Sequence, residues 1–180
     1  MSATVASLSK SGEHSFSKQG TDRLDVIAGE GVDGDAHCGT TVKHRSRVAI
    51  DPSKPNLRQV HLIAVELLDE LGREGFALKP GDLGENVLTH GLDLIALPRG
   101  TRLRIGLDAE LELTGLRNPC GQIEAFRPGL LAMVALRDGQ RAIVRQAGVM
   151  AIVTQGGRIS TGDAIEVTLP SLPHEALDRV

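Results

Sequence analysis

The segment Pro80-Gly81-Asp82-Leu83-Gly84-Glu85-Asn86 combines two glycines, two carboxylates and an amide, and it leads directly into the apolar stretch 87–90. Glycines allow a loop to turn sharply or to approach other backbone closely. Stretch 87–90 is expected to be a strand that starts at this loop. Glu85 and Asn86 can supply an acid/base group and a hydrogen-bonding amide, or they can satisfy the backbone of the turn itself, and the residue types leave both alternatives open.

The sequence on both sides of this loop predicts a mainly β protein. Alternating or short apolar stretches predict strands, and the spacing of Val65, Leu68 and Leu71 predicts a helix. Strands are expected at 4–8, 24–27, 59–63, 87–90, 101–105, 110–114, 148–154 and 164–169, a helix at 64–71, and helical segments from 120 to 136 interrupted at Pro128-Gly129. We expect one β-rich, barrel-like domain over residues 1–170 with helices outside it, followed by a polar tail, 171–180, that frays.

Composition limits the classes of function. The chain has 180 residues, a net charge of -3, three Phe and no Tyr or Trp, which argues against nucleic acid as a partner. Two cysteines are too few for a disulfide framework. The N-terminal stretch lacks the apolar core of a signal peptide, and the apolar run at 130–136 is too short to span a membrane. We therefore expect a cytoplasmic protein with no membrane partner.

The stretch Arg117-Asn118-Pro119-Cys120 places a cysteine after a predicted strand and at the start of a helical region. A helix N-terminus and the nearby charge of Arg117 both favour a thiolate. A thiolate can act as a nucleophile, a persulfide carrier or a ligand for a soft metal. The alternative is a small buried hydrophobic residue.

Other polar residues allow a functional and a structural interpretation. Asp35, His37 and Cys38 lie in one glycine-rich loop, and their spacing matches no known zinc pattern. Asp35 and His37 can bind a polar ligand or satisfy the loop backbone, whereas a structural role is expected for Cys38. The segment 40–58 is basic and is expected to be an ordered loop or flap. Five arginines can bind a phosphate or lie solvated on the surface: Arg45, Arg47, Arg58, Arg117 and Arg127. Four histidines are interpreted as ordinary loop, strand or tail residues: His14, His61, His90 and His174.

An ordered set of short motifs goes beyond composition. In chain order they are Gly34-Asp35-x-His37, Arg58-Gln59-Val60, Pro80 to Asn86, Gly91-Leu92-Asp93-Leu94, Leu97-Pro98-x-Gly100-Thr101-x-Leu103-x-Ile105-Gly106, Pro119-Cys120, Ala147-Gly148-Val149 and Gly162-Asp163. Together they closely resemble the MOSC family, the molybdenum cofactor sulfurase C-terminal domain. The resemblance covers residues 3–169, and the ordered set is much more specific than any single motif.

The resemblance implies a fold, a cofactor and a site. The fold is a partly open antiparallel β-barrel similar to the pyruvate kinase barrel domain, with helices packed outside. The cofactor is the molybdenum cofactor, a pterin dithiolene that bears a phosphate. The family cysteine, Cys120 here, either ligates molybdenum as the metal ligand or carries sulfur as a persulfide. The matched residues Asp35, His37, Arg58, Glu85 and Asn86 are candidate cofactor-binding residues, and Arg117 joins them because of its charge near Cys120.

Three functions follow from the resemblance, which is to the short, stand-alone bacterial members. The first is reduction of N-hydroxylated compounds by bound molybdenum cofactor, with an external flavin or iron–sulfur reductase as partner and a small molecule as substrate. The second is a sulfur carrier that receives persulfide sulfur on Cys120 from a cysteine desulfurase and passes it to a metal–sulfur centre. The third is a non-catalytic cofactor-binding module. Pyridoxal phosphate belongs to fused relatives, and no lysine here has a recognisable context for it.

Overall fold

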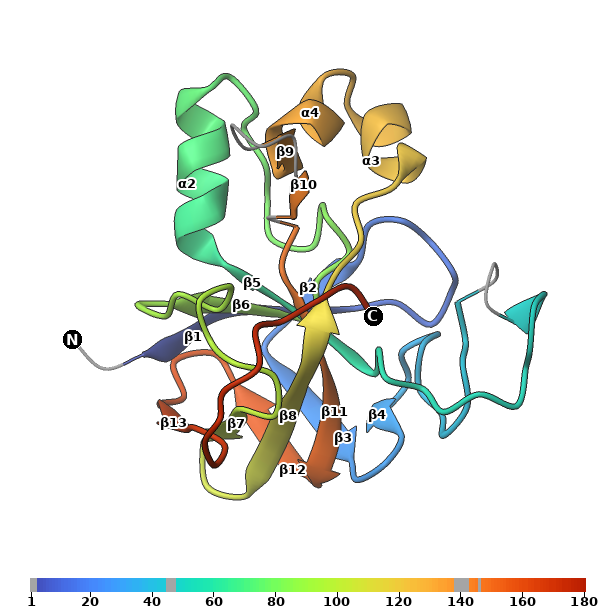
Figure 1. The fold of residues 1–180 in the computed structure, drawn as a ribbon, viewed down its shortest axis with the longest axis vertical. Helices are drawn as coiled ribbons and strands as arrows, with labels where there is room; N and C mark the ends of the chain where they lie inside the picture. The colour runs from blue at the N-terminus through green and yellow to red at the C-terminus, as the bar shows by residue number, and fades with distance from the viewer. Residues whose placement is uncertain (1–2, 45–47, 138–142, 146) are drawn as a thin grey trace.

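The computed structural model describes residues 3–44, 48–137, 143–145 and 147–180 (Figure 1). Its elements in chain order are β1 (Thr4–Lys10), β2 (Gln19–Thr21), β3 (Arg23–Ile27), β4 (Gly31–Val32), β5 (Val60–Ala64), α2 (Val65–Arg73), β6 (Val87–His90), β7 (Arg102–Ile105), β8 (Ala109–Leu116), α3 (Gly121–Phe126), α4 (Leu130–Val134), β9 (Ala135–Arg137), β10 (Ile143–Arg145), β11 (Val149–Gln155), β12 (Gly157–Ser160) and β13 (Ile165–Thr168).

The main sheet forms a barrel that is only partly closed. Within the described ranges it has eight strands, in the order β13-β7-β8-β11-β5-β6-β1-β2. Neighbouring strands are antiparallel except β5 and β6, which pair in parallel, a feature that the sequence did not predict. The sheet curls until Thr4 of β1 meets Ala164, next to β13, and the Val5 amide donates to the Asp163 carbonyl at 2.9 Å. The mainly β, partly open barrel is therefore confirmed.

Aliphatic side chains form two apolar clusters. The larger one involves the barrel strands. In one of them, β8, buried and half-buried residues alternate from Ala109 to Leu113, as expected for a strand with one face in a core. The smaller cluster lies between the barrel and the helices, where Ile63 of β5 joins Leu68 of α2 and Ile123 of α3. Figure 1 shows α2, α3 and α4 grouped on one side of the barrel strands, which confirms the prediction that the helices pack outside.

The helical region after Cys120 is shorter than predicted. α3 and α4 are separated at Pro128-Gly129, as expected, and Gly129 adopts a φ of 87°, a conformation that glycine reaches without a steric cost. The chain then enters β9 at Ala135 instead of continuing as a helix to 136. Strand β12 is a further difference, because no strand was predicted at these residues. Short strands that contain glycine have no periodicity long enough to read.

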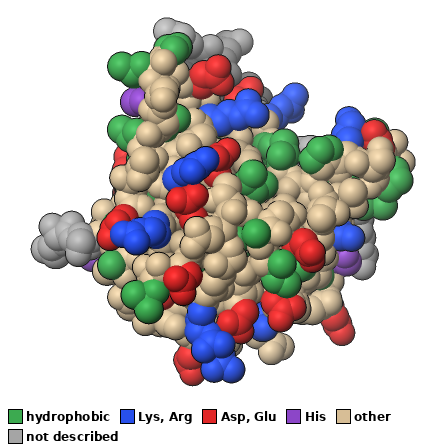
Figure 2. Space-filling view, turned by 90° about the horizontal axis from the view of Figure 1, so that it is seen from below, with side chains coloured by type: hydrophobic (Ala, Val, Ile, Leu, Met, Phe, Trp, Pro, Cys, Tyr) green, Lys and Arg blue, Asp and Glu red, His purple; other side chains and the backbone are tan. Residues whose placement is uncertain are grey.

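Two further observations concern the charged side chains on the surface and the length of the helices. Figure 2 shows acidic and basic side chains interspersed over the barrel end of the molecule. Among the helices of the described ranges, none combines the length and the apolarity needed to cross a bilayer.

Candidate functional site

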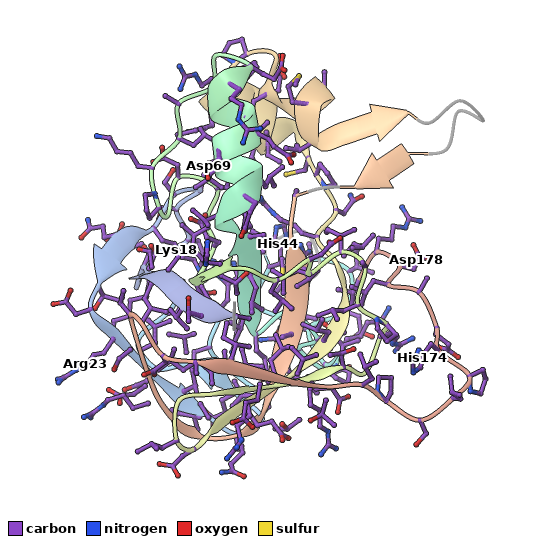
Figure 3. All side chains as sticks on the ribbon, turned by 90° about the vertical axis from the view of Figure 1, so that its left-hand side faces the viewer. Lys18, Arg23, His44, Asp69, His174 and Asp178 are labelled. Atoms are coloured by element: carbon purple, nitrogen blue, oxygen red, sulfur yellow. The ribbon has the colours of Figure 1, made fainter. Side chains whose placement is uncertain are left out.

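A cavity of about 290 Å³ opens where several loops meet at one end of the barrel. The segments that form it lie far apart in the sequence: the loop between β1 and β2, the loop after β4, both ends of the segment 40–58, the start of β5, the end of the Pro80–Asn86 loop, and the stretch after β8. Its lining residues are His14, Ser15, Phe16, Lys18, His37, Val42, Lys43, His44, Asn56, Arg58, His61, Gly84, Asn86, Arg117, Asn118, Cys120, Gln122 and Met150. Figure 3 shows two of them, Lys18 and His44, at the level where the helices meet the barrel.

The two glycines of the Pro80–Asn86 loop allow the Phe16–Lys18 segment to lie directly on it. Gly81 and Gly84 have φ values of 88° and 78°. A Cβ atom on Gly81 would collide with the Lys18 carbonyl, and one on Gly84 with the Phe16 carbonyl. The Lys18 amide also donates to the Gly81 carbonyl at 2.8 Å. This close approach places Phe16 and Lys18 in the cavity wall.

Asn86 connects three parts of the site. Its Oδ1 accepts from the His61 amide at 3.2 Å, and its Nδ2 donates to the Ser9 carbonyl at 3.2 Å and to Asp35 Oδ2 at 3.0 Å. β5, β1 and the loop after β4 are thereby tied to the beginning of β6. The side chain is 1% exposed, so these hydrogen bonds replace those that water would make.

Asp35 lies beneath the cavity wall and holds two cavity residues. Its Oδ2 is 2.7 Å from Lys18 Nζ, and its Oδ1 accepts from the His37 amide at 3.0 Å and lies 3.2 Å from His37 Nδ1. Burial alone would raise the pKa of the Asp35 carboxyl, but the hydrogen bonds from His37 and the charge of Lys18 outweigh it and hold that pKa well below its usual range. Asp35 is therefore an ionised support behind the wall. Burial lowers the pKa of Lys18, and Asp35 opposes that shift.

Glu85 also supports the site from behind. It is 1% exposed, and its Oε1 accepts from the Gly81 amide in the same loop. Burial raises the pKa of this carboxyl, while the backbone donors lower it. Of the two alternatives that the sequence left open for Glu85, this geometry favours the structural one.

Arg117 and Cys120 carry the strongest chemistry of the cavity. Arg117 is 8% exposed and its guanidinium carbon lies 5.6 Å from the centre of the Phe16 ring, while within the described residues its Nη1 has no hydrogen-bond partner. Burial lowers the pKa of Arg117, and the charges of Cys120 and Glu85 raise it. Cys120 is half-buried at the start of α3, and its Sγ donates to Gln122 Oε1 at 3.6 Å. A buried cation with an unused donor beside a thiol is suited to an anionic ligand with soft-metal or sulfur chemistry.

The cavity brings together most of the residues that the sequence singled out. His37, Arg58, Asn86, Arg117 and Cys120 line it, whereas Asp35 and Glu85 stand behind its wall. Arg127 lies elsewhere, over the Phe76 ring at 5.9 Å. Arg45 and Arg47 fall outside the described residues. Among the residues that the structure describes, no three His, Cys, Asp or Glu side chains are placed to hold a metal ion together.

Sequence reasoning missed several cavity residues, among them Lys18, His14 and His61. Lys18 belongs to a polar loop, and its burial depends on the contact with Gly81, which no local pattern reveals. His61 is 5% exposed within β5, and its Nε2 lies 2.8 Å from the Ala147 carbonyl. Burial lowers the pKa of His61 well below its usual value, so this imidazole is neutral at pH 7. A histidine inside an otherwise apolar strand is the one signal that could have pointed to it.

The segment 40–58 forms one wall of the cavity through its described residues. Thr41 and Pro55 form a β-bridge, the Val42 amide donates to the Lys54 carbonyl at 2.9 Å, and the Asn56 amide donates to the Thr40 carbonyl at 2.9 Å. The predicted ordered loop is thus confirmed for the described part of the segment.

The fold and the site together define a class: a small, partly open β-barrel with one thiol in a basic pocket. The chain belongs to the MOSC domain family, whose sequence profile matches residues 35–166. It is 31% identical to YuaD of Bacillus subtilis (strain 168), a protein with a provisional assignment to metal–sulfur cluster biosynthesis, and the match covers 93% of this chain and 91% of YuaD.

Solved structures agree with this family assignment. The crystal structure of YuaD from Bacillus subtilis superposes with a TM-score of 0.75 at 30% identity, covering 95% of this chain and 98% of YuaD. YiiM from Geobacillus stearothermophilus superposes with a TM-score of 0.65 at 14% identity, covering 97% of this chain and 79% of YiiM. The likeness to YiiM concerns the fold alone.

Proposed function

We propose that this chain binds molybdenum cofactor with Cys120 as the protein ligand and reduces N-hydroxylated compounds to amines. The observation that carries the proposal is the cavity in which Cys120 lies beside the buried Arg117. Electrons would come from an external flavin or iron–sulfur reductase, and a reducing cytoplasm would keep Cys120 a free thiol. The chain has two cysteines, too few to hold an iron–sulfur cluster of its own.

The donor set fits the cofactor. A thiolate is a good ligand for a soft metal, and guanidinium groups match the geometry of a phosphate. The unused Nη1 donor of buried Arg117 is suited to an anionic group in the cavity, and Arg58 and Lys18 add positive charge to the wall. Cys120 would hold the metal, and Arg117 and Arg58 would hold the phosphate. When bound, the cofactor supplies two-electron redox chemistry.

The rest of the site positions these groups. Phe16 stacks on Arg117 and limits the directions in which the guanidinium can turn. Asn86 and Asp35 fix the walls on the other side of the cavity through their hydrogen bonds. The protein would thus contribute binding, orientation and partial exclusion of water.

A second candidate is favoured by the relative's name. YuaD carries a provisional link to metal–sulfur cluster biosynthesis, which suits a carrier in which Cys120 receives persulfide sulfur from a cysteine desulfurase. The same basic pocket would stabilise the charge of a persulfide.

Metal and pterin analysis of the purified protein separates these functions. The protein is made in a host with intact cofactor synthesis as wild type, Cys120→Ser and Cys38→Ser, the last a control because Cys38 does not line the cavity. We expect near-stoichiometric molybdenum in wild type and Cys38→Ser and little in Cys120→Ser. Wild-type protein without molybdenum, but with a persulfide mass shift on Cys120 after desulfurase treatment, would favour the carrier. A molybdenum content that Cys120→Ser leaves unchanged would contradict the role of Cys120 as the ligand.

A further inference from the structure

His37 is held in a defined orientation by a buried carboxylate. Asp35 Oδ1 accepts from the His37 amide at 3.0 Å and lies 3.2 Å from His37 Nδ1. The other carboxylate oxygen, Oδ2, is occupied by Lys18 at 2.7 Å and by Asn86 at 3.0 Å. The Asp35 side chain is fully buried, whereas the His37 side chain is 25% exposed. This carboxylate is therefore fixed and ionised, with one oxygen left for the imidazole.

The pairing determines which nitrogen of His37 exchanges protons. An ionised carboxylate only accepts hydrogen bonds, so Nδ1 carries a hydrogen and Nε2 is the nitrogen that gains and loses a proton. The same arrangement of carboxylate and imidazole orients the general acid or base in many enzymes. His37 also lines the cavity that contains Cys120, so its ring reaches the space where a substrate would bind.

Several charged or titratable groups surround the imidazole. His14 lies edge-on to the His37 ring with 5.2 Å between ring centres, and His44 lies 6.4 Å away. Lys18, Lys43 and Arg58 share the cavity wall with His37. Among these groups, Asp35 is the anion that contacts the His37 ring directly.

We propose that Asp35 and His37 form an acid–base dyad in which His37 donates a proton to the leaving oxygen of the substrate and Asp35 is its positioning residue. The inference rests on the reductase function proposed above. Reduction of R–NH–OH consumes two electrons and two protons and yields R–NH₂ and water. The N–O bond breaks, the hydroxyl oxygen takes a proton from His37 Nε2 and leaves as water, and the nitrogen takes the second proton from solvent. The external reductase supplies the two electrons, and His37 regains its proton from solvent through its exposed side.

The pairing itself can be tested without any turnover. Long-range ¹H–¹⁵N spectra of the full-length protein, with labelled histidines, report the tautomer and titration of each ring. We expect neutral His37 to be the Nδ1–H tautomer in the wild type, and this preference to weaken in Asp35→Asn, because the ionised acceptor of the Nδ1 hydrogen is lost. His90 is a matched control, because its Nε2 lies 4.0 Å from Glu66 in an exposed pair. A neutral His37 with its hydrogen on Nε2 would overturn the dyad.

Turnover then tests the catalytic role. We expect His37→Ala to lower kcat by about 10²- to 10⁴-fold with molybdenum content unchanged, and imidazole added to the buffer to restore part of the lost rate. The pH profile of kcat should differ between wild type and Asp35→Asn, and His90→Gln should behave as wild type. A purely structural role predicts no rescue by imidazole and no shift of the pH profile. If the wild type is active and the kcat of His37→Ala lies within threefold of the wild-type value, the dyad alone is wrong. If the wild type contains no molybdenum or shows no turnover, the proposed function is wrong and the dyad with it.

Discussion

Two glycines set the distance between the Phe16–Lys18 segment and the Pro80–Asn86 loop. The sequence pointed to the carboxylate and amide side chains of the loop, but backbone atoms make the contact between the two segments. Gly81 and Gly84 leave room for the carbonyls of Lys18 and Phe16, and the cavity side chains of those two residues depend on that room. The geometry of the site therefore depends on the absence of a Cβ atom at these two glycines as well as on the reactive side chains.

Gly81→Ala should destabilise the protein more than Gly75→Ala does. The two glycines have similar φ values, 88° and 91°, so the backbone strain of an alanine is comparable at both, about 1 kcal/mol. Only at Gly81 would the new Cβ collide with a carbonyl, whereas nothing lies within 4 Å at Gly75. We expect a total loss of about 2–3 kcal/mol for Gly81→Ala in urea unfolding. Equal losses in the two variants would show that the contact with Lys18 relaxes freely.

At the scale of elements, the sequence predicted the long strands and α2 but not the behaviour of the tail. Residues 171–180 were expected to fray, and this prediction is wrong. The Arg99 amide donates to the Glu175 carbonyl at 2.8 Å, the Leu116 amide donates to the Asp178 carbonyl at 2.7 Å, and Leu177 joins the larger apolar cluster. A polar composition gave no sign of these contacts, because the backbone groups of Arg99 and of Leu116, the last residue of β8, provide the hydrogen bonds.

The tail should contribute to stability through Leu177. This side chain is 8% exposed, whereas Leu172 in the same tail is 80% exposed. Leu177→Ala should lower the free energy of unfolding by about 2–3 kcal/mol, because it leaves a cavity at the edge of the barrel core. Leu172→Ala, the matched control, should change it little. The measurement is the midpoint and slope of urea unfolding, and two variants of equal stability would mean that the tail is not docked in solution.

At the scale of the whole molecule, the cavity joins segments that no local pattern connects. Motif order identified His37, Arg58, Asn86 and Cys120 as candidates, and the charge of Arg117 near Cys120 added a fifth. The structure brings all five to one place. The motifs did not distinguish residues that line the cavity from those that support it, because burial behind a wall depends on the complete fold. Lys18 and His61 were missed for the same reason.

The net charge of -3 does not describe the cavity, which is basic and should bind small anions. Inorganic phosphate at ten times its Kd should raise the free energy of unfolding of the wild type by about 1.4 kcal/mol. In thermal unfolding, Arg117→Gln should lose most of this gain. Arg127→Gln is the control, because Arg127 also lies over a phenylalanine ring but outside the cavity. A phosphate effect that persists in Arg117→Gln would place the anion elsewhere on the molecule.

The docked tail has a practical consequence for anyone who handles this protein. The Val180 amide donates to the Leu116 carbonyl at 3.3 Å, and Leu116 is the neighbour of Arg117. Any polypeptide that continues beyond Val180, whether natural sequence or an affinity tag, must therefore leave the molecule beside the cavity wall. A purification handle is better fused ahead of Thr4, where it does not start next to Arg117.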